Sequence, residues 1–249
     1  MRSLQAVVVL FVAALVSSPS SLANADTDRT VRSVRFNEGS TSTVIKGSVQ
    51  GYHYVDYQLR AGAGQRMVVS LHSSHGANYF NLLPPDSNGA AMYAGEVGGN
   101  QFAGLLPDDG IYTLRVYLMR SAARRKESAH YTLAIQVDGA RLQPLASKDD
   151  AVVRGTRYHA HATVACRPAY TQTRTCEAWV VRRGNDGTAT VELRWDAASK
   201  RRILFVKGEA KAADAAQAPN FSKDEKGNFV VSFGGEERFE IPEALVFGG

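Results

Sequence analysis

The chain has 249 residues, of which 29 are Lys or Arg, 24 are Asp or Glu and 6 are His, so its formal net charge is +5 at pH 7. This length allows one large domain or two small ones. The positive excess is mild and spread along the chain, whereas a nucleic acid-binding protein gathers its cations in a patch or stripe. Composition therefore argues against DNA or RNA as the partner and favours an anionic surface or an acidic protein cleft.

The first 25 residues have the pattern of an export signal. Arg2 supplies a positive start, residues 6–16 form an apolar run, and Ala23-Asn24-Ala25 is an A-x-A cleavage site. The apolar run is too short to span a bilayer. We therefore expect cleavage before Asp26 and an exported, soluble mature protein.

Residues 26–138 are predicted to be all β. Runs of β-forming residues are short, and glycines or Pro-containing turns such as residues 84–86 and 106–110 interrupt them. In such turns Pro fixes φ and Gly supplies a positive φ. Many short strands with regular turn signals are typical of an antiparallel β-sandwich. The expected strands include residues 34–36, 43–45, 52–59 and 67–71.

Three tyrosines in this region are candidates for a partner-binding surface. The alternation in residues 52–59 predicts a core face and leaves Tyr52 and Tyr54 on the polar face. Tyr gives a large contact area at low entropy cost, so aromatic rings on a polar face suggest a binding surface. The alternative is that a neighbouring loop covers them. In Tyr79-Phe80 the side chains point to opposite faces, so one should be core and the other exposed. Tyr79 is the third candidate.

The most distinctive stretch is a charged loop between two alternating apolar segments. Residues 111–119 and 130–137 both alternate with the strand period of two. The loop between them, residues 120–127, is rich in cations and contains no Gly, Pro or Asn. A loop that only had to turn the chain would use those residues. The loop is therefore a candidate functional element.

Within this loop Arg120, Arg124 and Arg125 are the candidate binding residues. A single helical turn over residues 120–124 is plausible, and the i,i+4 spacing would then aim Arg120 and Arg124 the same way. The alternative is a solvated hairpin tip, which is the usual meaning of a charge cluster.

A second domain is predicted after a linker. Residues 139–155 are polar and turn-rich and lack periodicity, which indicates a linker. Residues 156–249 should form a small, mostly β domain. Its expected elements are strands around residues 158–166, 178–181, 191–195, 203–206, 229–233 and 238–241, and a short Ala-rich helix within residues 210–218.

The two cysteines, Cys166 and Cys176, are expected to form a disulfide. An exported chain meets an oxidising environment, in which an intrachain bridge is the default. Closing so short a loop would stabilise the fold by about 3 kcal/mol on the chain-entropy model. A metal site would need two further ligands at a suitable spacing. We interpret the bridge as a structural clamp at the mouth of a hairpin.

The chain shows little sign of catalytic chemistry. It has no G-x-S-x-G, H-E-x-x-H or P-loop motif. His159 and His161 share a strand face, but a metal there would need a third ligand from elsewhere. Asp108 and Asp109 pair two carboxylates inside a turn, where Asp is expected for backbone reasons. We expect no enzyme activity, no cofactor and no metal.

Four stretches carry a family resemblance. They are residues 51–57 (Gly-Tyr-His-Tyr-Val-Asp-Tyr), 63–65 (Ala-Gly-Gln), 106–112 (Leu-Pro-Asp-Asp-Gly-Ile-Tyr) and 114–125 (Leu-Arg-Val-Tyr-Leu-Met-Arg-Ser-Ala-Ala-Arg-Arg). With them, residues from about 34 to 137 resemble the periplasmic inhibitors of goose-type (g-type) lysozyme, which are small β-sandwich proteins. The first and last stretches are the distinctive ones. The family's inhibitors are typically one domain, and residues 156–249 resemble a small envelope-associated domain without a known activity.

The resemblance implies a function and a location. It implies a periplasmic protein that binds a goose-type lysozyme and plugs its active-site cleft with Tyr52, Arg120 and Arg124. The first alternative is a peptidoglycan- or carbohydrate-binding module, in which Tyr52, Tyr54 and Tyr79 stack on sugar rings. The second is a structural envelope domain whose exposed residues only keep it soluble.

Overall fold

The computed structural model of the protein describes residues 28–248, so the expected export signal lies outside the described part. Strands dominate residues 28–248, and the helices among them, α1 to α3, are each about one turn long. The all-β prediction is confirmed. Across these residues, none of the helices combines the length and the apolar character needed to cross a membrane.

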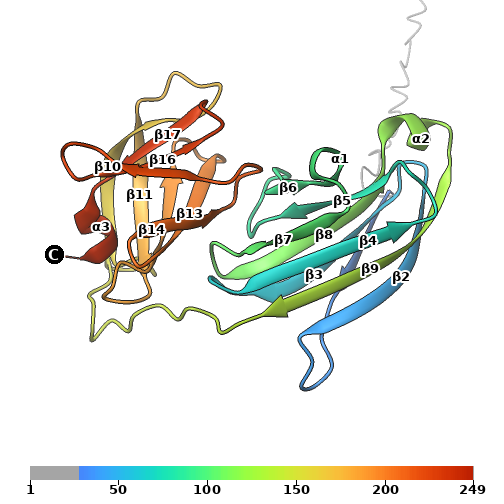
Figure 1. Ribbon diagram of the computed structural model, residues 1–249, viewed down its shortest axis with the longest axis horizontal. Coiled ribbons are helices and arrows are strands. Elements are labelled where there is room, and N and C mark those ends of the chain that lie inside the picture. The colour runs from blue at the N-terminus through green and yellow to red at the C-terminus, as the bar shows by residue number, and fades with distance from the viewer. Residues whose placement is uncertain (1–27, 249) are drawn as a thin grey trace, which may run out of the picture.

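The N-terminal half is a sandwich of two sheets (Figure 1). One sheet has five strands in the order β1-β3-β8-β5-β6, and the other has four in the order β2-β9-β4-β7. β1 and β3 run parallel, and the remaining pairs are antiparallel. The elements are β1 (Arg29–Ser33), β2 (Ser42–Gln50), β3 (Tyr54–Ala61), β4 (Arg66–Ser73), β5 (Asn78–Leu83), β6 (Tyr93–Ala94), α1 (Gly95–Gly98), β7 (Gln101–Leu105), β8 (Gly110–Leu118), α2 (Arg120–Arg124) and β9 (Ser128–Asp138).

Alternate residues of facing strands build the sandwich core. Tyr112, Leu114 and Val116 of β8 point into it from one sheet, and Leu133 and Ile135 of β9 enter from the other. The predicted alternation of both segments is therefore confirmed. Each such aliphatic side chain contributes about 1.5–3 kcal/mol by its burial.

β8 and β9 do not form a hairpin, although a hairpin tip was one interpretation of the charged loop. β8 lies between β3 and β5 in the five-stranded sheet, whereas β9 lies between β2 and β4 in the four-stranded sheet. α2 therefore carries the chain from one sheet to the other across the end of the sandwich (Figure 1). The reason is that the apolar faces of the two strands pack against each other across the core, not side by side.

The C-terminal half is one antiparallel sheet of eight strands in the order β14-β13-β12-β11-β10-β17-β16-β15. The sheet curls around a core of its own, so that its edge strands β14 and β15 contact each other. α3 packs against β10, β11 and β12. The elements are β10 (Ala160–Arg167), β11 (Thr175–Arg182), β12 (Ala189–Arg194), β13 (Lys200–Val206), β14 (Glu209–Ala213), β15 (Asn220–Lys223), β16 (Phe229–Phe233), β17 (Glu237–Ile241) and α3 (Glu243–Phe247).

The Ala-rich helix expected within residues 210–218 is wrong, because this segment begins in strand β14. Ala212 and Ala213 are buried and pair with Leu204 and Ile203 of β13. The turn before β14 has positive φ at both Lys207 and Gly208, which suits a tight hairpin. Tertiary pairing has thus overridden the helix propensity of alanine, which is only a weak preference.

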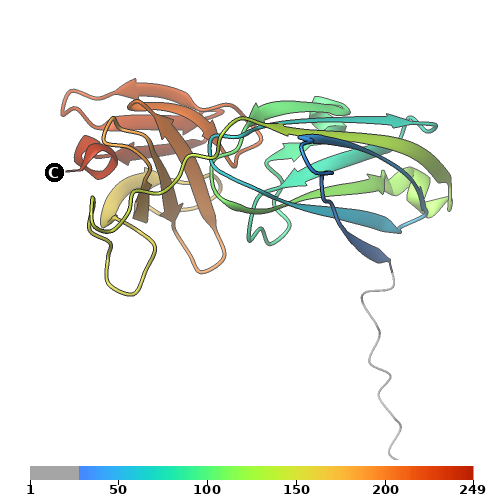
Figure 2. The ribbon, with the colours of Figure 1, turned by 90° about the horizontal axis from the view of Figure 1, so that it is seen from below.

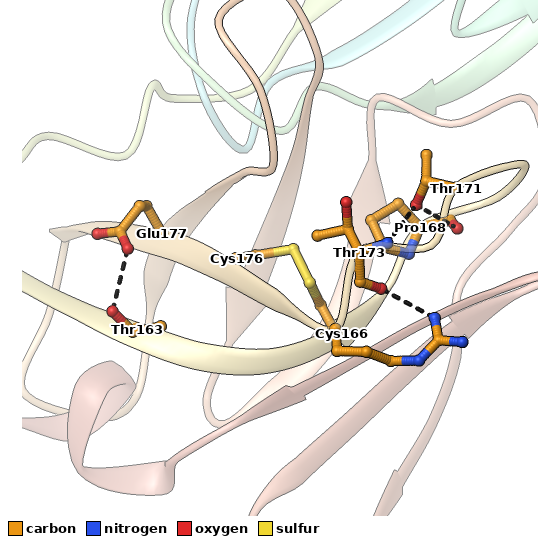
Figure 3. Close-up of a disulfide and its surroundings, with 8 residues drawn as sticks. Thr163, Cys166, Pro168, Thr171, Thr173, Cys176 and Glu177 are labelled. Carbon is orange, nitrogen blue, oxygen red and sulfur yellow. Dashed lines mark hydrogen bonds between the residues drawn. A yellow bond between two sulfur atoms is a disulfide. The ribbon is translucent and has the colours of Figure 1, made fainter.

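The predicted disulfide is present between Cys166 and Cys176 (Figure 3). The two Cα atoms are 5.8 Å apart. In the β10–β11 hairpin Cys176 lies opposite Val164, and Thr163 donates a hydrogen bond to Glu177 on the neighbouring strand. The bridge therefore closes the hairpin at the point where the two strands separate into the connecting loop.

The two halves meet at the end of the sandwich where β8 begins. No helix or strand lies between Asp138 and Ala160, and this single segment joins the halves (Figure 2). An apolar cluster spans the junction, with Ala63 from the sandwich and Leu204 and Ala212 from the eight-stranded sheet. α2 lies at the opposite end of the sandwich from the C-terminal half (Figure 1).

Candidate functional site

α2 forms the exposed end of the sandwich and displays the arginines that the sequence singled out. It begins directly after β8 and covers the end of the core with Ala122 and Ala123, which are fully buried. Arg120, Arg124 and Arg125 are exposed. Residues four apart on a helix lie on the same face, so Arg120 and Arg124 project from one side of this turn.

The turn that carries Tyr52 lies directly against the α2 loop. Gly51 has φ of +57°, and a Cβ atom there would lie 3.6 Å from the carbonyl oxygen of Ala123. The Gly51 N–H donates a hydrogen bond of 2.9 Å to the carbonyl oxygen of Glu127. Tyr52 is 57% exposed. The fold thus brings Tyr52 and the arginine loop, about 70 residues apart in the sequence, to the same end of the molecule.

Glu127 connects three loops at this end. Its main-chain oxygen holds the β2–β3 turn through Gly51. Its carboxylate accepts a bond of 2.6 Å from Nε of Arg125 and lies 2.9 Å from Nε2 of His75 in the β4–β5 loop. The hydrogen bond from Arg125 is the main cause that lowers the pKa of Glu127. Arg125 is therefore engaged within the loop.

Arg120 and Arg124, in contrast, form no ion pair with any residue in the range 28–248. Their guanidinium groups remain available for a partner. We refer to Tyr52, Arg120, Arg124 and Arg125 as the tip. All four residues are candidates from the sequence. The structure adds Glu127 and His75, whose contacts connect the loops around the tip.

Tyr54 and Tyr79 lie on the outer face of the five-stranded sheet, not in the tip. Phe80 is fully buried and Tyr79 is partly exposed, as predicted for adjacent strand residues. The guanidinium of Arg115 lies over the Tyr54 ring, 4.4 Å from its centroid. The polar face predicted for β3 is therefore real, although an arginine covers one side of the Tyr54 ring.

Asp56, on the same face, is a buried, ion-paired carboxylate that the sequence did not reveal. It is 0% exposed and pairs with Arg29 at 2.9 Å and with Arg115 at 2.8 Å. These partners are 27 and 59 residues away in the sequence. Alternation alone placed Asp56 on a polar face, and no local signal shows that two distant arginines enclose it.

Asp108 and Asp109 are likewise more than turn residues. Arg183, which directly follows β11 in the C-terminal half, donates hydrogen bonds to Asp108 at 3.0 Å and to Asp109 at 2.9 Å. The Arg183 side chain is 0% exposed. Arg157 also donates to Asp108 at 2.8 Å. The two carboxylates therefore bind the C-terminal half to the sandwich, which their place in a turn could not indicate.

His159 and His161 do not converge on a common site. The His159 ring lies between the carbonyl oxygen of Leu145 and the main-chain N–H of Arg182. His161 stacks on Trp179, with the ring centroids 3.9 Å apart. Throughout residues 28–248 no three His, Cys, Asp or Glu side chains are grouped in a way that could hold a metal ion.

The relatives described here each match less than half of this chain. No family profile matches it. The inhibitor of g-type lysozyme from Escherichia coli K12 is 34% identical over 107 residues, which cover 42% of this chain and 78% of the relative.

Two crystal structures of periplasmic inhibitors of g-type lysozyme are also similar. The inhibitor from Aeromonas hydrophila is 37% identical and matches 45% of this chain and 98% of its own, with a TM-score of 0.42. The inhibitor from Salmonella Typhimurium is 28% identical and matches 43% of this chain and 97% of its own, with a TM-score of 0.35. With 34% identity to the Escherichia coli inhibitor over more than three quarters of that protein's length, this chain belongs to the family of inhibitors of g-type lysozyme.

Proposed function

We propose that the protein is a periplasmic inhibitor of a g-type lysozyme and that its tip enters the active-site cleft of the enzyme. The observation that carries this proposal is the joint exposure of Tyr52, Arg120 and Arg124 at one end of the sandwich. The predicted export signal and the names of the relatives support the location. The relatives are named as inhibitors and not as enzymes, in line with the expectation from the sequence.

The chemistry of a glycosidase cleft suits this tip. Such a cleft holds a catalytic carboxylic acid whose ionisation and access are essential. A guanidinium can bind a carboxylate through two parallel, charge-assisted hydrogen bonds. Within residues 28–248, Arg120 and Arg124 are paired with no acidic side chain that they would have to leave before binding a partner. Arg125, in contrast, is already paired with Glu127. Tyr52 would occupy a position in the cleft where a sugar ring binds.

The C-terminal half leaves the tip accessible. It packs on the opposite end of the sandwich, where Arg183 meets Asp108 and Asp109 (Figure 1). A lysozyme engaged by the tip would therefore approach from the far end of the molecule. We further propose that residues 26–138 and 156–249 are two domains joined by residues 139–155, and that the first of them carries the inhibition.

Inhibition is tested by titrating the purified protein into hydrolysis assays of g-type, chicken-type and invertebrate-type lysozymes. We expect the g-type enzyme to lose its activity at a stoichiometric amount of inhibitor, and the other two enzymes to retain theirs. Full activity of every g-type enzyme at a large excess of the protein would contradict the proposed function.

A further inference from the structure

The outer face of the five-stranded sheet carries ordered rows of polar and aromatic side chains that the tip does not use. Successive rows on one face of a strand are about 7 Å apart. Taken along β8, the rows are Tyr117 opposite Tyr79, then Arg115 opposite Asp56, then Thr113 opposite Gln58. The face thus presents a row of phenol rings, a charged row, and a row with an amide and a hydroxyl group.

A buried carboxylate fixes the charged row in place. Asp56 accepts one hydrogen bond from Arg29, at 2.9 Å, and two from Arg115, at 2.8 and 2.9 Å. The side chains of Arg29 and Arg115 remain 35% and 30% exposed, while that of Asp56 is 0% exposed. Two cations around one anion leave this row with a net positive charge. Asp86, the other acid that lines the groove, lies 3.4 Å from a guanidinium nitrogen of Arg202. No described residue accepts a hydrogen bond from Nη1 of Arg115 or from either Nη of Arg29.

A polar groove of about 480 Å³ runs beside these arginines. β3 and β8 form its floor, and the loop after β5, residues 84–89, forms a wall. The C-terminal half supports this wall from behind, because Nη1 of Arg202 donates a bond of 2.7 Å to the carbonyl oxygen of Pro85. Arg202 is itself almost fully buried. The C-terminal half therefore helps to shape a groove on the sandwich.

The floor of the groove carries polar side chains that can still form hydrogen bonds to a ligand. Gln58 and Thr113 face each other across β3 and β8 and are half-buried. Among residues 28–248, neither side chain forms a hydrogen bond to the protein. A half-buried amide without a protein partner is satisfied by water or by a ligand.

We propose that this face binds a carboxylate-bearing amino-sugar oligomer, which is the chemistry of the bacterial wall glycan. The free N–H groups of Arg29 and Arg115 bind the carboxylates. Gln58 and Thr113 bond to acetamido and hydroxyl groups, and the ring of Tyr79 packs against the apolar face of a sugar. This site is separate from the tip, so it does not depend on lysozyme inhibition.

The test is calorimetric titration of the full chain with two soluble probes. One probe is a peptidoglycan fragment of two disaccharide-peptide units, which carries carboxylates, and the other is chitotetraose, which has amino sugars but no carboxylate. We expect the peptidoglycan fragment to bind at least about tenfold more tightly, since hydrogen bonds to charged groups are the strong ones.

Arg29→Gln should reduce this preference to about twofold or less, because it removes one of the two guanidinium groups. Asp56 keeps both bonds from Arg115 in this variant, so the sheet should remain folded. The matched control is Arg32→Gln. Arg32 lies on the same strand opposite the core residue Tyr57, and its loss should leave both dissociation constants unchanged.

Three results would overturn the proposal. The first is equal affinity for the two probes, and the second is no binding of the peptidoglycan fragment at millimolar concentration. The third is an Arg29→Gln variant that loses affinity for g-type lysozyme and keeps its affinity for the peptidoglycan fragment, since this face would then belong to the enzyme interface. If Arg29→Gln lowers the melting temperature, Gln58→Ala, which breaks no ion pair, takes its place and should weaken binding of both probes.

Discussion

Asp109 shows how a single carboxylate can link the stability of this protein to pH. Burial by itself would raise its pKa, but the hydrogen bond from Arg141 and the charge of Arg183 outweigh burial and lower the pKa below 3.8, the ordinary value. An acid whose pKa is lower in the folded state stabilises that state above its unfolded pKa. This contribution is lost as the pH falls through the folded pKa.

We therefore predict that the free energy of unfolding falls below about pH 4 and that Asp109 accounts for part of the fall. Asp109→Asn should cost about 1 kcal/mol at pH 7. The value is modest because the buried Arg183 keeps Asp108 as a partner, and because Arg141 is half exposed and its interaction is screened. The cost should shrink as the pH drops, because the wild type loses the same interactions. Urea unfolding at pH 7, 4 and 3 measures this. Asp149→Asn, at an exposed position, is the control, and a constant difference at all three pH values would contradict the account.

At the scale of single residues, the roles of the buried carboxylates could not be predicted from the sequence. The sequence around Tyr52, Arg120 and Arg124 is enough to single them out. Tyr52 is an aromatic residue on a polar strand face, and the two arginines lie in a cation-rich loop without Gly, Pro or Asn. Asp56 and Asp108 acquire their roles from arginines far away in the sequence, such as Arg115 and Arg183. A sequence pattern records which face a side chain is on, but not which distant partner encloses it.

Among the structural elements, α2 and the two loops beside it are held together at the end of the sandwich that carries the tip. Glu127 ends the α2 loop, where its N–H donates to the carbonyl oxygen of Ala122, and it also holds the Gly51 turn and the His75 loop. α2 is only five residues long and has no capping side chain. Its orientation therefore depends on these contacts with its neighbours and not on its own helical stability.

Glu127→Gln should weaken lysozyme binding about fivefold without a large change in melting temperature, because an exposed ion pair contributes little to the fold. Hydrogen exchange at the amides around Tyr52 and α2 should become faster in the variant. Glu38→Gln, at an exposed position far from the tip, should change neither quantity. An unchanged dissociation constant together with unchanged exchange would show that Glu127 does not position the tip.

The elements themselves were largely predictable, but their pairing was not. Alternation located β8 and β9, and the absence of turn residues marked α2. The assignment of β8 and β9 to different sheets follows from core packing, which the period of two cannot specify. The helix prediction for the Ala-rich segment around β14 fails because the segment pairs with Leu204 of β13, and this tertiary contact cannot be read from the local sequence.

The molecule as a whole places its two halves in direct contact while leaving the tip free. Arg183 is buried between Asp108 and Asp109, and Thr190 donates a bond of 2.8 Å to the carbonyl oxygen of Pro107. Removing one partner of a buried ion pair leaves an uncompensated charge, at a cost of about 3–5 kcal/mol. Arg183→Ala should therefore weaken the contact between the halves. In the wild type, the buried apolar cluster of Ala63, Leu204 and Ala212 should keep the halves together even without the covalent link between them.

We predict that a protease cuts the mature protein first within residues 139–155 and that the nicked halves stay associated. Lys148 in this segment is exposed, and its side chain is 81% accessible. Size-exclusion chromatography of the nicked protein should give one peak. Arg183→Ala should separate it into two, whereas Lys148→Ala, cut at another site in the segment, should not. Dissociation of the nicked wild type would show that the contact between the halves is weak.

The central claim is that Arg120 and Arg124 bind the lysozyme cleft, and mutant dissociation constants test it most directly. Arg120→Ala and Arg124→Ala should each weaken binding to one g-type lysozyme by about thirtyfold, since an interface arginine lost from opposite a carboxylate costs about 2 kcal/mol or more. Arg124→Lys should also weaken binding, because an ammonium cannot form the paired bonds of a guanidinium.

Tyr52→Ala should weaken binding as well, and Lys126→Ala, in the same loop, should change little. Melting temperatures of all variants should stay within a few degrees of the wild type, because exposed residues contribute at most about 0.5 kcal/mol to stability. The measurement is the dissociation constant of each variant for the same enzyme. Wild-type affinity in both Arg120→Ala and Arg124→Ala would contradict the claim and reduce the tip to a solvated loop.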